Sequence, residues 1–331
     1  MTLTTPPTVK SLQEYAYEAI AQHLKKTLKW EKAVKKDEDA EALHQMRVGM
    51  RRLRTAISRF DVLLNLPPAA SAAKVGKIAR RLGELRDIDV LKETLETRYQ
   101  PNLPAKEQKV LQTAFHALNK QRQKALSHTQ VTLKGQSYKS LKQSLTDWLD
   151  NPIYQPLASL PIAQVLPDLL LPEISNFFLH PGWLVGTTVS DSEVKISPNL
   201  EPEDIEKQFQ TQGESIHDLR KQAKRVRYQM ELFKELYCED YAAYVAEVKS
   251  IQEILGNMQD SLVMGEWLAD IFKSEMDAQL PTLASLLKAN RDQLWQEWQP
   301  LQERYLQTEH RHKLRLIILN PLVNFSVDET S

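Results

Sequence analysis

Two basic segments of the chain repeat one pattern of side chains that suits the binding of an anion. The first, HQMRVGMRRLRTAISRF, covers residues 44–60 and holds one histidine, five arginines and no acid. The second, HDLRKQAKRVRYQMELF, covers residues 217–233. The guanidinium fork of arginine matches phosphate oxygens, and a lysine ammonium acts as a point charge. Both segments are therefore candidates for holding phosphate-like groups.

The cations of each segment fall on one face if the segment is a helix. A helix turns by about 100° per residue, so positions 0, 3, 7 and 10 of each segment share a strip about 80° wide. The members of the two strips are His44, Arg47, Arg51 and Arg54 in the first segment and His217, Arg220, Lys224 and Arg227 in the second. Apolar residues fill the neighbouring arc, which is expected to face a core.

A second motif repeats at the same offset of 173 residues that separates His44 from His217. The sequence RLGELRDIDVL begins at Arg81, and ILGNMQDSLVM begins at Ile254, so that a Leu-Gly pair and a later aspartate coincide. Two motifs that share one offset indicate an internal duplication, and the period is too long for a solenoid repeat. We therefore expect two related helical bundles whose basic faces meet at a shared groove.

The rest of the chain predicts an all-α fold. Glycine occurs only 9 times in 331 residues, and apolar residues recur at spacings of three and four. Helices are predicted over residues 9–36, 37–65, 69–98, 105–130, 137–150, 203–237, 240–277 with a bend near Gly256, and 282–308. The predicted organisation is a first helical bundle at 1–135, a fifth helix with a proline-rich connection at 136–204, and a second bundle at 205–331. The stretch VLPDLLLPEI in the connection is expected to form a helical turn or two, and residues 182–196 weakly suggest a hairpin.

Composition restricts the classes of partner and the location. The 43 basic and 43 acidic residues cancel, so any attraction for an anion must be local. The single cysteine, Cys238, forms no intrachain disulfide, which fits a reducing compartment. The N-terminus lacks the pattern of a signal peptide, and the apolar stretches fall short of the 18 or more residues of a membrane span. We expect a cytoplasmic protein with no membrane contact.

The choice of anion follows from what accompanies the cations. Few aromatic residues apart from Tyr228 accompany the basic strips. Single-stranded nucleic acid is usually held by stacking of its bases on aromatic side chains. Zero net charge disfavours a general duplex binder. Helical strips with about 5 to 6 Å between turns could follow a chain of repeated phosphates. A linear inorganic polyanion is the ligand that the residues favour.

The doubled pattern His-x-x-Arg-x-x-x-[Arg/Lys]-Arg-x-Arg, each copy followed by Leu-Gly-x-x-x-Asp, resembles the CHAD family of histidine-containing α-helical domains. The resemblance extends over roughly residues 10–310. It implies two pseudo-symmetric four-helix bundles, binding of inorganic polyphosphate at a basic surface, and association with polyphosphate granules. By position, it implies polyphosphate contacts at His44, Arg47, Arg51, Arg52, Arg54, His217, Arg220, Lys224, Arg225 and Arg227, and more loosely at Lys25, Lys77 and Arg81. No cofactor, metal or catalytic residue is expected.

Other functions remain open beside this interpretation. A lone histidine on a helical bundle could accept a phosphoryl group in a phosphotransfer relay, although the flanking cations fit that role poorly. Hydrolysis of polyphosphate would need carboxylates that hold a metal, and Glu84, Asp87, Asp89 and Asp260 are the candidates. The same carboxylates could instead pair with arginines. A generic polyanion or protein-interaction module, for nucleic acid or an acidic partner, would use the same basic groove.

Overall fold

The computed structural model describes residues 10–190, 193–197 and 200–322, and in this part of the chain it is helical apart from a short hairpin. The first half contains α1 (Leu12–Lys29), α2 (Glu31–Lys36), α3 (Ala40–Arg59), α4 (Ala72–Thr94), α5 (Ala105–Lys134) and α6 (Gln136–Asp150). The second half contains α7 (Ile162–Phe178), β1 (Thr187–Ser190), β2 (Glu193–Ile196), α8 (Pro202–Leu232), α9 (Glu239–Phe272), α10 (Met276–Gln279), α11 (Pro281–Leu306) and α12 (Thr308–Leu319). The all-α prediction is confirmed.

Local capping explains where the first helices begin and end. Ser11 and Glu14 form a capping box at the start of α1, in which each side chain bonds to the backbone of the other residue. The helix predicted over residues 9–36 is two helices, because the chain breaks at Trp30. Asp37 then adopts a left-handed conformation that ends α2, and the side chain of Asp39 accepts the backbone N–H of Glu41 to begin α3.

The connection between the halves holds more regular structure than expected. The turn or two predicted around VLPDLLLPEI is the 17-residue helix α7, which contains Pro167 and Pro172. Residues Ile162–Leu184 are long and apolar enough to cross a membrane by length and composition, which corrects the prediction that no stretch reaches that size. Within the fold, 44% of its most apolar 18-residue window is buried, and α7 packs against α8 and α12. The weak hairpin pattern is confirmed by the antiparallel pair β1–β2.

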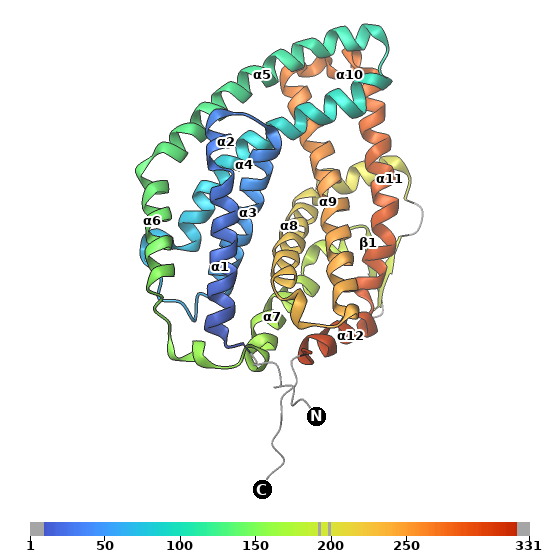
Figure 1. Cartoon of the computed structure of the whole chain (residues 1–331). Coiled ribbons are helices and arrows are strands. Elements are labelled where there is room, and N and C mark those ends of the chain that lie inside the picture. Colours follow the sequence, from blue (N-terminus) through green and yellow to red (C-terminus); the bar gives the residue numbers. More distant parts are fainter. Residues whose placement is uncertain (1–9, 191–192, 198–199, 323–331) are drawn as a thin grey trace, which may run out of the picture.

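The two halves stand side by side and are joined at both ends (Figure 1). At the lower end, the rings of Phe60 in the first half and Phe233 in the second pack edge to face, with centroids 5.8 Å apart. Tyr15 stacks on Phe233 at the same separation, and its hydroxyl donates to the carbonyl of Leu232. These aromatic residues belong to one apolar core that extends into both halves.

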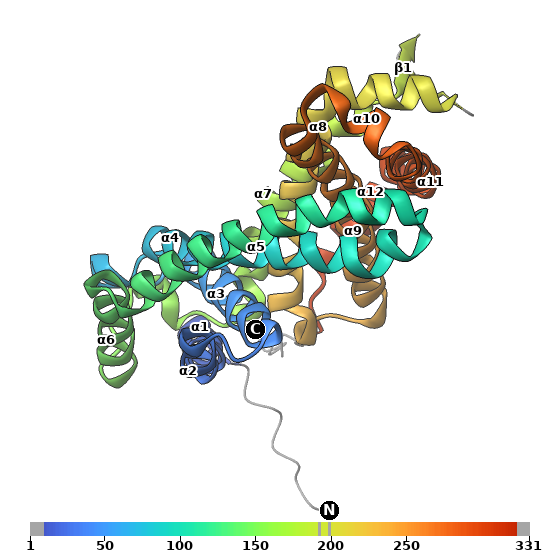
Figure 2. The same cartoon turned by 90° about the horizontal axis from the view of Figure 1, so that it is seen from above.

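A separate apolar core joins the halves at the upper end, where α5 crosses above α9 and reaches the start of α11 (Figures 1 and 2). It includes Leu95 and Leu111 from the first half and Leu268 and Leu283 from the second. The buried carboxylate of Glu107 on α5 accepts hydrogen bonds from the backbone N–H groups of Thr282 and Leu283. These groups, in the first turn of α11, have no hydrogen-bond partner within their own helix. The helices between the two junctions, α3 and α8 above all, are thereby held facing each other.

Candidate functional site

The basic strips of α3 and α8 come together where the halves face each other. Four residues, Arg47 and Arg51 from α3 with Arg220 and Lys224 from α8, form what we call the central cluster. Their proximity is clear at Lys224, whose pKa is lowered to about 6 by burial first and then by the charges of Arg51, Arg47 and Arg220. The structure thus brings residues of both predicted strips next to each other.

An arginine in each half lies across a glycine and reaches an aspartate. A methyl group added at Gly83 would lie 3.4 Å from Nε of Arg47, and the guanidinium of Arg47 donates to Asp87 at 3.1 Å. Burial and the neighbouring Arg51 lower the pKa of Arg47 to about 10. In the Leu-Gly-x-x-x-Asp motif, the glycine therefore leaves space for the arginine side chain to pack against the helix, and the aspartate forms an ion pair with its guanidinium.

The second half repeats this contact with similar geometry. A methyl group at Gly256 would lie 3.3 Å from Nε of Arg220, whose guanidinium reaches Asp260 at 3.5 Å. The Arg47 and Arg220 side chains are only 18% and 23% exposed, whereas those of Asp87 and Asp260 are 70% and 56% exposed. We call each such arrangement of glycine, arginine and aspartate an arginine clasp. Each clasp holds one guanidinium of the central cluster in place.

The inner members of the central cluster have no such anchor. Within the described ranges 10–190, 193–197 and 200–322, neither Arg51 nor Lys224 forms an ion pair with a carboxylate. Both are half-buried. Two basic side chains are thus held beside two clasped arginines without acids of their own, so positive charge on both would cost electrostatic repulsion that an anion can offset.

The two leading histidines lie at corresponding places beside the clasps. Burial lowers the pKa of His44, and the charges of Arg86, Arg47 and Arg51 contribute. Burial likewise lowers the pKa of His217, where a hydrogen bond that the imidazole donates to Gln259 acts in the opposite direction. Sequence analysis did not single out Arg86 or Gln259. The offset that relates the motifs also relates these two residues, since each directly precedes the aspartate of its motif.

The last cations of the two strips have different surroundings. Arg54 is exposed and lies over Gly76 of α4, where an added methyl group would be 3.1 Å from its Nε. Arg227 pairs with Glu231 at 3.4 Å and stands 4.7 Å from the ring centroid of Tyr228. The last cation of the second strip, Arg227, is therefore held by a carboxylate, whereas Arg54 in the first strip is exposed.

The remaining predicted residues lie around the cluster and not within it. Arg52 pairs with Glu231 across the two halves at 3.5 Å, and the exposed Arg225 lies near Arg59. On α4, Lys77 is exposed and Arg81 is held by the Glu84 carboxylate at 2.9 Å. Lys25 is exposed on α1. The structure does not gather these residues into one site with the four central cations.

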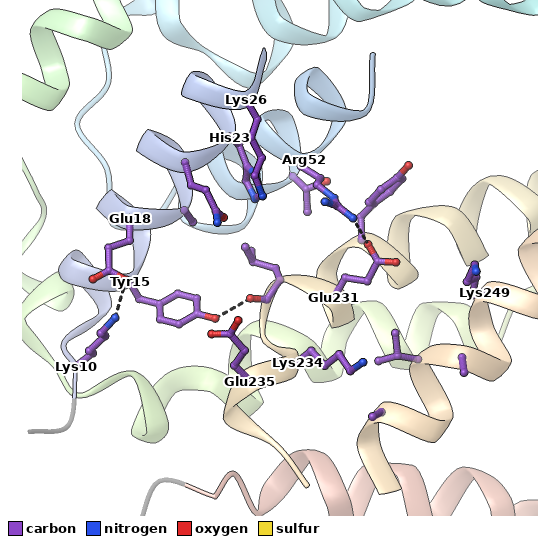
Figure 3. Close-up of a pocket in the computed structure, with 18 residues that line it drawn as sticks. Lys10, Tyr15, Glu18, His23, Lys26, Arg52, Glu231, Lys234, Glu235 and Lys249 are labelled. Atoms are coloured by element: carbon purple, nitrogen blue, oxygen red, sulfur yellow. Dashed lines mark hydrogen bonds and ion pairs between the residues drawn. The ribbon is translucent and has the colours of Figure 1, made fainter. Parts of the chain in front are cut away.

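A cleft of about 690 Å³ opens beside the cluster, between α1 and α3 on one side and α8 and α9 on the other. Figure 3 shows that its two walls carry charged side chains facing each other. The basic residues that line it are Lys10, His23, Lys26, Arg52, Lys234 and Lys249, and the acidic residues are Glu18, Glu231 and Glu235. Tyr228 lines the cleft and also lies beside Arg47, so the cluster borders the cleft.

Most of these cleft residues were missed by sequence analysis, because they lie outside the two repeated motifs. Among the charged residues of the cleft, only Arg52 was named from the sequence. His23 is only 8% exposed, and burial followed by the charges of Arg52 and Lys26 lowers its pKa to about 4. It is therefore a neutral imidazole among cations at neutral pH.

The carboxylates considered for metal binding are partners of arginines. Asp89 is buried and accepts from Nε of Arg122 at 2.7 Å, and the same guanidinium makes two bonds to Asp37. Asp87 and Asp260 belong to the clasps. Among the described residues, no group of three or more histidine, cysteine, aspartate or glutamate side chains is placed to hold one ion. The acids thus organise the basic groups of the site.

Comparison with known proteins gives a consistent result for the family and the fold. A family model described as CHAD domain matches residues 18–269. The crystal structure of the CHAD domain from the plant Ricinus communis aligns with a TM-score of 0.58 at 23% identity, covering 95% of this chain and 94% of that one. PptA from Streptomyces chartreusis aligns with a TM-score of 0.60 at 14% identity, covering 89% of this chain and 100% of the other. No curated protein matches the sequence.

Proposed function

The chain belongs to the CHAD domain family, and from this premise we propose that it binds inorganic polyphosphate through the central cluster. The polymer would lie between α3 and α8, with its phosphates against guanidinium groups from both halves. Polyphosphate binding is what the family resemblance implies, and the site's chemistry is suited to it. Arginine donors are rigid and permanently charged, and they can grip successive phosphates through paired hydrogen bonds.

One observation carries the proposal: Arg51 and Lys224 are half-buried beside two further arginines and have no acidic partner among the described residues. Holding like charges together in a partly desolvated place is unfavourable, so a protein that retains such an arrangement is suited to an anion that offsets the repulsion. An ordinary solvated helix face would instead alternate acids and bases.

We also propose that the two halves arose by duplication and form two related four-helix bundles. The matched contacts of Arg47 with Gly83 and Asp87, and of Arg220 with Gly256 and Asp260, support this. The same offset of 173 residues carries the start of α5 close to that of α11, and the start of α6 close to that of α12. A groove between duplicated halves would present the polymer with two similar walls.

The protein is proposed to act by binding alone, in the cytoplasm and on polyphosphate granules, without membrane or nucleic-acid partners. The role of the candidate carboxylates as arginine partners supports a non-catalytic function. The aromatic residue at the cluster, Tyr228, faces Arg227 in a cation–π contact, which supports a ligand without bases to stack.

Titration calorimetry tests the proposal directly. The full chain is titrated with long-chain polyphosphate, with single-stranded DNA and with free phosphate, all in near-physiological salt. We expect tight binding of polyphosphate alone, with no release of phosphate. Equal binding of DNA would indicate a generic polyanion groove, and no binding of any of the three would overturn the proposal in favour of a protein partner.

A further inference from the structure

Lys224 differs from its neighbours in the central cluster because it can lose its charge near neutral pH. Guanidinium groups stay protonated throughout the physiological range, whereas a lysine amine gives up its proton readily when it is desolvated. The charged groups that face Lys224 are Arg47 and Arg51 from α3, Arg220 from its own helix α8, Asp87 from α4 and Asp260 from α9. The equivalent residue of the first half is Arg51, whose side chain is a guanidinium.

The two aspartates do not compensate Lys224, because each holds an arginine. Asp87 binds Arg47 at 3.1 Å and Asp260 binds Arg220 at 3.5 Å, while Lys224 has no carboxylate within ion-pair distance among residues 10–190, 193–197 and 200–322. Its half-buried amine therefore lies within electrostatic reach of three guanidinium groups, those of Arg47, Arg51 and Arg220. In the empty groove, loss of the lysine proton is the way in which this cluster can relieve its repulsion.

We propose that Lys224 takes up a proton when a polyphosphate chain enters the groove, so that binding of the polymer is coupled to the charging of one lysine. This inference rests on the proposed function. In the empty protein the pKa of Lys224 is about 6, which leaves the amine neutral at pH 7 to 8. Several phosphate charges beside it reverse the sign of the local field and favour the ammonium.

The coupling makes Lys224 a determinant of selectivity between a polymer and a single phosphate. Charging the amine requires an anion that outweighs three guanidinium groups. A polymer places several phosphate charges in the cluster at once, whereas a free phosphate ion supplies at most two. Since a proton is a reactant in this scheme, the affinity for polyphosphate should fall about tenfold per pH unit between pH 7 and 8.

The test is calorimetry of the full chain with long-chain polyphosphate at pH 8.0, in two buffers with different ionisation enthalpies, Tris and HEPES. We expect the observed enthalpies to differ by an amount that corresponds to uptake of about one proton per protein chain. The same titration with K224R, which keeps the positive charge permanently, should show strong binding with almost no proton uptake. The tenfold pH dependence of Kd should also disappear in K224R.

A second variant excludes the histidines as the source of the proton. H44Q/H217Q removes both imidazoles near the cluster, and whatever affinity it retains should still be accompanied by uptake of about one proton. K224M provides a further check, because it should bind with no uptake at all. Circular dichroism confirms that each variant is folded.

The outcomes separate this inference from the function on which it rests. If wild-type protein gives no binding heat with polyphosphate, the proposed function fails. If it binds but the enthalpy is the same in Tris and HEPES, the proton coupling is wrong while polyphosphate binding stands. Uptake that persists in K224R, or that vanishes in H44Q/H217Q, would equally assign the proton to another group and overturn the role of Lys224.

Discussion

The two halves of the molecule hold one arginine in the same way and differ in the cation beside it. Arg47 and Arg220 each rest on a helical glycine and end at an aspartate. One turn further along, the first half has Arg51 and the second has Lys224. The two halves thus suggest a division of roles: the clasped arginines are held in a fixed geometry, and the inner pair sets how much charge the central cluster carries without ligand.

Reversing the charge of the inner pair should have the largest effect. In R51E/K224E, two carboxylates replace the cations that lack acidic partners, and polyphosphate binding should weaken by at least about a hundredfold, because two charge-assisted contacts are lost and repulsion is added. Calorimetry measures the binding, and circular dichroism should show unchanged helicity since both side chains lie outside the apolar core.

The matched control is K106E/K109E on α5, which changes the net charge by the same amount at exposed positions away from the groove. It should bind polyphosphate almost as wild type does. Binding by R51E/K224E that survives at low salt would show that the central cluster is not the site.

Filling the glycine of either clasp should weaken binding by a smaller and similar factor. A β-carbon alone would come within 3.4 Å of the Arg47 side chain at Gly83 and 3.3 Å of the Arg220 side chain at Gly256, so the further methyl groups of valine must push the guanidinium away. We expect G83V and G256V each to lower the affinity about tenfold, equivalent to one lost charge-assisted hydrogen bond. Calorimetry against polyphosphate measures both.

Alanine provides the control at the same position. G83A adds only the β-carbon, which is in ordinary contact distance, and it should keep the affinity while raising helix stability by about 0.5–1 kcal/mol in thermal unfolding. Unchanged affinity in both valine variants would mean that the clasped arginines do not contact the ligand. Loss in only one half would show that the two clasps are not equivalent.

The sequence alone was sufficient to place the clasped and inner cations of each half on one helix face, because helical periodicity fixes which side chains share a face. His44, Arg47 and Arg51 were placed on one strip by their spacing, and a constant offset identified their counterparts. The Leu-Gly-x-x-x-Asp motif was recognised as repeated, yet its purpose depended on two helices crossing. Only the fold brings Gly83 of α4 beneath Arg47 of α3.

The cleft beside the cluster lay beyond sequence analysis for a related reason. Lys10 and Lys26 belong to α1 and its approach, while Lys234 follows α8, so these residues are separated by more than 200 positions in the chain. They face each other because aromatic packing at Phe60 and Phe233 fixes how the halves meet. Periodicity describes one helix and carries no information about this contact.

Lys224 should also make the stability of the empty protein depend on pH, in contrast to Arg51. Its pKa of about 6 in the fold lies below the ordinary lysine value of about 10.4, so between these values the unfolded chain binds more protons and folded stability rises with pH. We expect a gain of about 1–2 kcal/mol from pH 7 to 9 after allowance for solvent screening, measured by denaturant unfolding without ligand.

K224M should flatten this rise, whereas R51M should reduce it only in part, because burial, the main cause of the lowered pKa of Lys224, remains when one neighbouring charge is removed. His23 contributes with the same sign, since its pKa is lowered to about 4, but only between about pH 4 and 6.5. A scan that starts at pH 7 therefore isolates the lysine. Equal slopes for wild type and K224M would show that Lys224 stays charged in the empty groove.

Removing the carboxylate of a clasp should have the smallest effect and the opposite sign. The side chains of Asp87 and Asp260 are 70% and 56% exposed, so their ion pairs contribute little to stability, about 0–1 kcal/mol. D87N and D260N keep the shape of the clasp and remove one negative charge from beside the incoming polymer. Polyphosphate affinity should rise about two- to threefold at low salt and less at high salt, as calorimetry at two ionic strengths would reveal.

A loss of affinity in either variant would mean that the aspartate acts chiefly by aligning its arginine. The geometry of the clasped arginine would then matter more for polyphosphate binding than the negative charge beside it.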